Sequence, residues 1–150
     1  MAMTVSVKDL PDLVGTEVGV SPWLTIDQTM VDGFADLTRD HSRIHVDQDY
    51  AAASPWGTTL VHGMFTLALS ASFLMEVITI TGYNGGLSRG YDRVRFTAPV
   101  PVGSRLRMRV AVRSVEPRED GWELRFQETT ECEGVDGPVC IAERISRYFR

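Results

Sequence analysis

The sequence predicts an α+β fold in which an antiparallel sheet wraps around one long helix. Two observations carry this prediction. The stretch from Gly63 to Ile80 has apolar residues on nearly every helical face, which is typical of a helix buried all round. The second half of the chain instead alternates apolar and polar residues, which is typical of strands with one wet face. We therefore expect the later strands to cover the helix.

Before the long helix, the sequence predicts an extended segment and two shorter helices. Residues 16–24 are expected to be extended. Thr25 and Gln28 have the spacing of a capping box, which predicts that a first helix begins there and ends near Thr38. Asp47 is expected to cap a second, short helix, which the following Ser-Pro-Trp-Gly sequence ends.

After the long helix, the sequence predicts an antiparallel meander. The alternating or apolar segments that predict its strands are residues 94–96, 106–112, 122–126 and 139–145. Glu119-Asp120-Gly121 has the composition of a hairpin turn, and residues 134–138 form a second turn-rich segment.

Composition narrows the function classes. The 150 residues are expected to form one domain, residues 1–150. A net charge of −5 argues against a nucleic-acid partner, whose phosphates are bound mainly by Lys and Arg. The apolar run is short and interrupted by Ser70, Ser72 and Glu76, so we expect no membrane span.

The two cysteines, Cys132 and Cys140, flank a glycine-rich turn, where a cross-strand disulfide is one alternative. Because the N-terminal residues show no apolar signal region, we expect a cytoplasmic protein with free thiols instead. No further ligands at suitable spacing surround them, so no metal site is expected.

Asp40 and His45, five residues apart after the first predicted helix, are the main candidates for chemistry. A carboxylate and an imidazole presented by a loop can transfer protons to and from a substrate. Alternatively, they are a helix-end aspartate and a surface histidine. His62-Gly63 opens the long helix, where a backbone N–H can stabilise an oxyanion. Alternatively, Gly63 only permits close packing there.

The segment from Phe34 to Asp47 resembles the (R)-specific enoyl-thioester hydratase motif of MaoC-like dehydratases. Residues 55–64 and 96–103 are similar to the second and third blocks of that family. The resemblance runs from about Val18 to the C-terminus and is strongest to the nodulation protein N-like branch. Three ordered blocks at compatible spacing make it specific.

The resemblance implies a hot-dog fold and a homodimer with an acyl tunnel near the subunit interface. It implies hydration of a trans-2-enoyl thioester to a (3R)-3-hydroxyacyl thioester, or the reverse dehydration. Asp40 and His45 match the catalytic dyad, and Gly63 matches the oxyanion donor. His62, Trp56 and Met64 are expected to bind substrate. No metal or other cofactor is implied, because coenzyme A or acyl carrier protein is part of the substrate.

Two other functions remain open on the same fold: an acyl thioesterase, and a non-catalytic acyl-binding partner subunit. Glu76 is a candidate for the helix carboxylate of a thioesterase, but it lies more than three turns beyond Gly63, which favours a solvated helix end instead.

The non-catalytic alternative follows from a departure from the family pattern, because Arg39 replaces the glycine before the aspartate. Ser42 and Arg43 also replace an Asn-Pro pair, and Ala71 stands where relatives have a serine that supports the aspartate.

Overall fold

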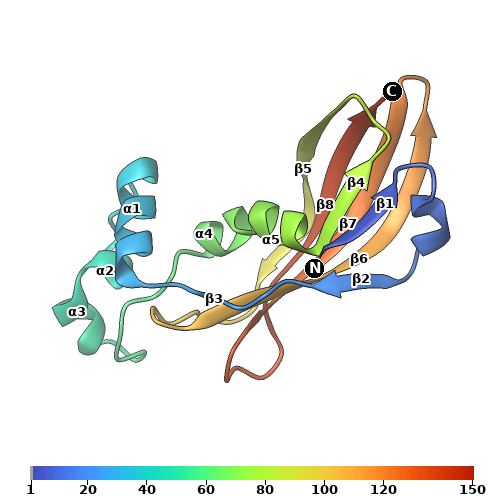
Figure 1. Cartoon of the computed structure of the whole chain (residues 1–150). Helices are drawn as coiled ribbons and strands as arrows, with labels where there is room; N and C mark the ends of the chain where they lie inside the picture. The colour runs from blue at the N-terminus through green and yellow to red at the C-terminus, as the bar shows by residue number, and fades with distance from the viewer. Residues whose placement is uncertain (1) are drawn as a thin grey trace.

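The computed structural model describes residues 2–150 and shows a curved antiparallel sheet beside two short helices (Figure 1). The strands of this sheet are β2 (Glu17–Val20), β3 (Leu24–Thr25), β5 (Gly85–Phe96), β6 (Arg105–Arg118), β7 (Gly121–Cys132) and β8 (Pro138–Phe149). Their order is β2-β6-β7-β8-β5, with β3 also pairing with β6. This architecture confirms the predicted α+β fold.

The helical run begins at Gly63 as predicted but ends earlier than predicted. It consists of α4 (Gly63–Ala68) and α5 (Ser70–Val77), which meet at Leu69. The predicted extension to Ile80 is wrong, because Ile78–Thr81 form strand β4, which pairs in parallel with β1 (Met3–Ser6). The sequence Ile-Thr-Ile-Thr is β-branched throughout, and such residues favour strands. Within residues 2–150, no helix has the length and apolar character needed to cross a membrane.

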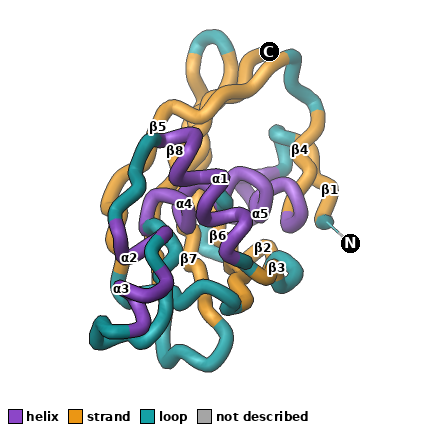
Figure 2. The backbone as a smooth tube through the Cα atoms, turned by 90° about the vertical axis from the view of Figure 1, so that its left-hand side faces the viewer, coloured by secondary structure: helices purple, strands orange, loops and turns teal. Residues whose placement is uncertain are grey.

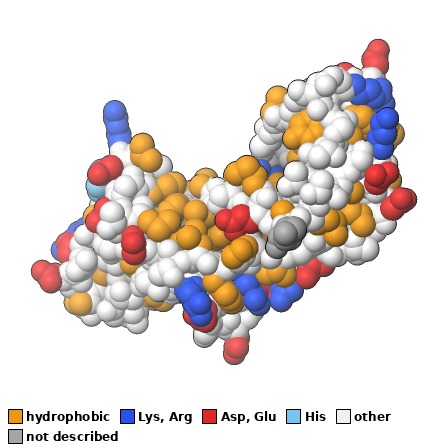
Figure 3. Space-filling model, in the orientation of Figure 1, with side chains coloured by type: hydrophobic (Ala, Val, Ile, Leu, Met, Phe, Trp, Pro, Cys, Tyr) orange, Lys and Arg blue, Asp and Glu red, His pale blue; other side chains and the backbone are white. Residues whose placement is uncertain are grey.

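The prediction that this helical run is buried all round is also wrong. The residues that are fully buried are Thr66, Ser70, Phe73 and Val77, which recur at helical spacing along one side. On the open side, Met64 is 59% exposed and Met75 is 69% exposed. Figure 3 shows hydrophobic side chains gathered over this part of the surface. The two helices therefore contact the sheet with one face only.

The core lies between this buried helix face and the sheet. The strand alternation predicted for residues 106–112 is confirmed, because Leu106, Met108, Val110 and Val112 are fully buried. Leu124 and Phe126 of β7 are equally buried in the same cluster. The Glu-Asp-Gly hairpin joins β6 to β7 as predicted, and both cysteines are free.

Three helices project beyond the sheet: α1 (Gln28–Thr38), α2 (Arg43–Val46) and α3 (Gln48–Ala52) (Figure 1). Figure 2 views the molecule from this end. The predicted capping box is wrong: Thr25 lies in β3, and the Asp27 carboxylate accepts the Met30 N–H at 2.9 Å. The predicted cap of the short helix is confirmed, since Asp47 accepts the Tyr50 N–H at 2.9 Å.

Candidate active site

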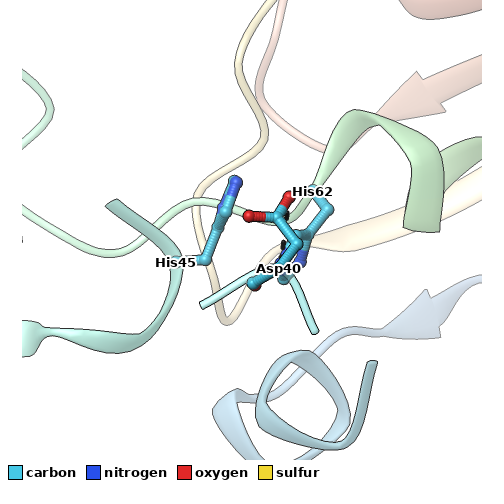
Figure 4. A group of neighbouring side chains, drawn as sticks. All are labelled: Asp40, His45 and His62. Carbon is cyan, nitrogen blue, oxygen red and sulfur yellow. Dashed lines mark hydrogen bonds and ion pairs between the residues drawn. The ribbon is translucent and has the colours of Figure 1, made fainter. Parts of the chain in front are cut away.

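Asp40, His45 and His62 come from three separate segments and lie together (Figure 4). Asp40 follows α1, His45 belongs to α2, and His62 is the residue just before α4. One carboxylate oxygen of Asp40 and one ring nitrogen of each histidine lie within 4.8 Å of one another. A single water can bridge polar groups at such separations.

His45 is buried and has a defined tautomer. Its Nδ1 lies 2.7 Å from the Leu60 carbonyl oxygen, which can only accept, so Nδ1 carries the proton. Burial, as the largest cause, lowers the pKa of His45 below its ordinary value. The imidazole is therefore neutral near pH 7 and keeps a basic lone pair on Nε2.

Asp40 is ionised and held by Ser42. Its Oδ1 accepts the Ser42 hydroxyl at 2.6 Å and the Ser42 backbone N–H at 3.3 Å. These two hydrogen bonds are the main causes that hold the pKa of Asp40 below its usual value. The side chain is half exposed. Sequence analysis missed this role of Ser42, although an Asp followed two residues later by a Ser is a turn pattern that could have indicated it.

Arg39 does not contact Asp40. It ends α1 in the left-handed conformation, with φ of 63°, which explains why glycine suits this position in the family pattern. Among residues 2–150, its exposed guanidinium has no hydrogen-bond or ion-pair partner. Arginine in place of glycine at position 39 therefore changes the backbone preference at the helix end, and the Arg39 side chain does not pair with the Asp40 carboxylate.

Gly63 borders a cavity of about 370 Å³ that His45 also lines. The walls are mainly apolar and include Val61, Thr66 and Phe96. As the first residue of α4, Gly63 has a backbone N–H with no acceptor inside the helix. A Cβ at this position would meet the Phe96 ring at 3.0 Å, so a larger residue would require that ring to move.

The other expected substrate contacts lie elsewhere. Trp56 is 47% exposed and Met64 is on the open side of α4, and neither lines this cavity. His62 is buried beside His45 and does not line it either. Glu76 is exposed near the end of α5.

Within the described part of the chain, residues 2–150, no helix serine hydrogen-bonds to Asp40. Ala71 is exposed, and the Ser72 hydroxyl donates to the Leu69 carbonyl oxygen. The Ser70 hydroxyl accepts from Arg144 at 2.7 Å, on the sheet side of the helix. Gln28 has a supporting role that sequence analysis missed, because its amide donates to the His45 carbonyl oxygen at 2.8 Å. In the sequence, the spacing between Thr25 and Gln28 indicated only a helix cap and gave no indication of this hydrogen bond.

The two histidines are arranged poorly for a metal ion. Their rings are stacked, with centroids 3.7 Å apart and planes at 24°. A metal lies in the plane of each imidazole that binds it, at about 2.0–2.1 Å for zinc. Stacked rings direct their nitrogens side by side and not toward one point, so the donor set does not fit a metal well.

The chain was compared with known proteins. Residues 9–131 match the family model described as "MaoC like domain". The chain belongs to the MaoC-like family. This MaoC-like chain is 45% identical, over 144 residues that cover 95% of each protein, to 3-hydroxyacyl-thioester dehydratase Z of Mycobacterium tuberculosis. It is 40% identical to nodulation protein N of Rhizobium leguminosarum bv. viciae, covering 94% of this chain and 89% of that protein.

The fold agrees with this assignment. The solved (R)-hydratase from A. caviae, involved in PHA biosynthesis, superposes with a TM-score of 0.72 at 23% identity. The match covers 89% of this chain and 94% of that one. The MaoC-like chain therefore has the hot-dog fold that the resemblance implied, and its family is one of hydratases and dehydratases.

Proposed function

We propose that this protein catalyses (R)-specific hydration of trans-2-enoyl thioesters to (3R)-3-hydroxyacyl thioesters, or the reverse dehydration. The observation that carries the proposal is the neutral His45 and the ionised Asp40, placed together beside a cavity that ends at a glycine N–H. The family membership and the relative named 3-hydroxyacyl-thioester dehydratase Z support the same reaction.

In the proposed mechanism, Asp40 and the Nε2 atom of His45 hold one water between them. The dyad takes a proton from the water as its oxygen bonds to C3 of the enoyl group, and the proton is then returned to C2. Addition places negative charge on the thioester oxygen, to which Gly63 donates its N–H. Removing one such donor costs about 3–4 kcal/mol of transition-state stabilisation in characterised enzymes.

The substrate is proposed to carry coenzyme A or acyl carrier protein as its thiol component, with the acyl chain in the apolar cavity. Trp56, Met64 and residues of a second subunit are then candidates for contacts outside that cavity. No redox cofactor is needed, because water is added and no electrons are transferred. No metal is included in the proposal, because the stacked histidine rings do not fit one well.

A homodimer is part of the proposal. The open side of α4 and α5 exposes Met64 and Met75. Hydrophobic side chains gather on this part of the surface (Figure 3). An apolar surface beside the proposed site suits a second copy of the chain, which would also complete the acyl tunnel.

The test is an assay with crotonyl-CoA and a medium-chain trans-2-enoyl-CoA. We expect loss of the enoyl absorbance, a (3R) product and no release of free thiol. Release of free thiol with the double bond intact would instead indicate a thioesterase. Binding of both thioesters without turnover, repeated with the corresponding acyl-carrier-protein substrates, would indicate a non-catalytic acyl-binding subunit.

A further inference from the structure

His62 contacts both members of the dyad and is not positioned to contact substrate. Only 2% of its surface is exposed, and it does not line the cavity at Gly63. Its Nε2 lies 3.0 Å from the backbone carbonyl oxygen of Asp40. Its ring stacks on the His45 ring with centroids 3.7 Å apart. One side chain therefore links the backbone of Asp40 to the imidazole of His45.

The hydrogen bonds of His62 define one tautomer. A carbonyl oxygen only accepts, so the Nε2 atom that faces Asp40 carries the proton. The other nitrogen, Nδ1, is buried and has no hydrogen-bond partner among residues 2–150. A buried polar atom without a partner destabilises a protein. A phenylalanine ring would fill this space without that penalty, so packing alone does not account for a histidine here.

Asp40 needs such a restraint. It follows the left-handed Arg39 at the end of α1, and among residues 2–150 its carboxylate accepts hydrogen bonds only from Ser42. The other carboxylate oxygen, Oδ2, lies 4.0 Å from the same Nε2 atom of His62. The bond from His62 ties the Asp40 backbone to the start of α4, where Gly63 lies. The His62 ring also contacts the Phe34 ring, with centroids 5.0 Å apart and planes at 57°.

We propose that His62 is a positioning residue. Its main role is the hydrogen bond from Nε2–H, which fixes the Asp40 backbone, whereas its ring only packs on the face of His45. This inference rests on the proposed function, because it assigns His62 to the same reaction. It also revises the expectation that His62 binds substrate: the residue acts on the substrate only through Asp40 and His45.

Two substitutions separate the hydrogen bond from the ring. His62→Gln keeps an N–H donor at a similar reach but loses the ring, whereas His62→Phe keeps the ring but loses the donor. We expect kcat of His62→Phe to fall about 10–100-fold, as is typical when a supporting hydrogen bond is removed, with KM nearly unchanged. We expect kcat of His62→Gln to be at least about tenfold higher than kcat of His62→Phe.

The control is His41→Phe, because His41 is exposed and pairs only with Asp36. Thermal melts establish that each variant is folded. A folded His62→Phe protein with wild-type kcat would overturn the proposal. Equal losses in His62→Phe and His62→Gln would also overturn it, because the donor would then have no role. A rise in KM at constant kcat would instead return His62 to substrate binding.

A second readout needs no substrate. Nitrogen-15 NMR of labelled histidine distinguishes the two neutral tautomers. Variants in which one histidine is replaced assign the signals of the chain's three histidines. The proposal requires the Nε2–H tautomer for His62, and the Nδ1–H tautomer would overturn it. Failure of the wild-type protein to hydrate any enoyl thioester would contradict the proposed function. The NMR experiment would still show whether His62 donates its Nε2–H to the Asp40 carbonyl oxygen.

Discussion

At the scale of single residues, the proposed dyad is held by backbone groups as well as by side chains. Asp40 and His45 were predicted as a pair, and the structure places them together. The group that fixes the His45 tautomer is the carbonyl oxygen of Leu60. Every residue has a carbonyl group, so side-chain patterns carry no signal for this contact. In the structure, the Arg39 side chain does not pair with the dyad. The sequence alone could not predict this, because adjacent side chains can point either toward each other or apart.

The pH dependence of turnover tests the state of His45. Burial disfavours the imidazolium, so its pKa lies below the ordinary 6.5, and the lone pair needed for catalysis persists below that pH. We expect kcat/KM to decrease as pH falls, with an apparent pKa below 6.5. The measurement is kcat/KM for a trans-2-enoyl-CoA across the acidic range. A decrease centred above 6.5 would contradict a buried, neutral His45.

At the scale of elements, the sequence predicted the strands well and the central helix less well. Alternation in β6 identifies its buried face directly, because a strand has a period of two residues. The apolar run from Gly63 has no such contrast, so the change from α5 to β4 at Ile78 depends on β-branching and on pairing with β1. Strand β1 lies near the N-terminus, far from Ile78 in the sequence. Periodicity within a short window of sequence therefore cannot indicate this pairing.

The buried pair between β7 and β8 gives a prediction at this scale. Arg144 Nε lies 2.5 Å from Glu128 Oε1, and both side chains are almost fully buried. Glu128→Ala leaves the Arg144 charge buried without its partner, which should lower the free energy of unfolding by about 3–5 kcal/mol. Urea denaturation measures this loss.

The matched control for Glu128→Ala is Glu133→Ala, because Glu133 pairs with Arg105 on the surface. Water solvates an exposed charge that has lost its partner, so this variant should lose much less stability. Equal losses in the two variants would show that burial does not set the strength of the Arg144 pair.

At the scale of the whole molecule, the fold class was predictable but the open side of the helices was not. One apolar helical run followed by an alternating meander indicated a sheet around a helix, which the structure confirms. The sequence also predicted a helix buried on all sides, whereas one side is open in the single chain. Apolar composition alone cannot distinguish burial within a chain from burial against a second copy.

The proposed homodimer is tested by a charge on the open side of the helices. Met75→Glu places a carboxylate on that surface, where pairing would bury it without a partner. We expect the wild-type protein to sediment as a dimer and Met75→Glu to sediment as a monomer at micromolar concentration. Val14→Glu is the control, because Val14 is also exposed and apolar but lies outside α4 and α5. A monomeric wild-type protein would contradict the proposal.

The most direct test of the account is the initial rate of enoyl-CoA hydration in three variants. Asp40→Asn and His45→Ala remove the two groups proposed to move protons, whereas His41→Ala removes an exposed histidine that pairs with Asp36. We predict that kcat falls by about 100-fold or more in each of the first two variants, in line with typical acid–base contributions, and stays near wild type in the third. Near-wild-type kcat in folded Asp40→Asn or His45→Ala would contradict the proposed dyad.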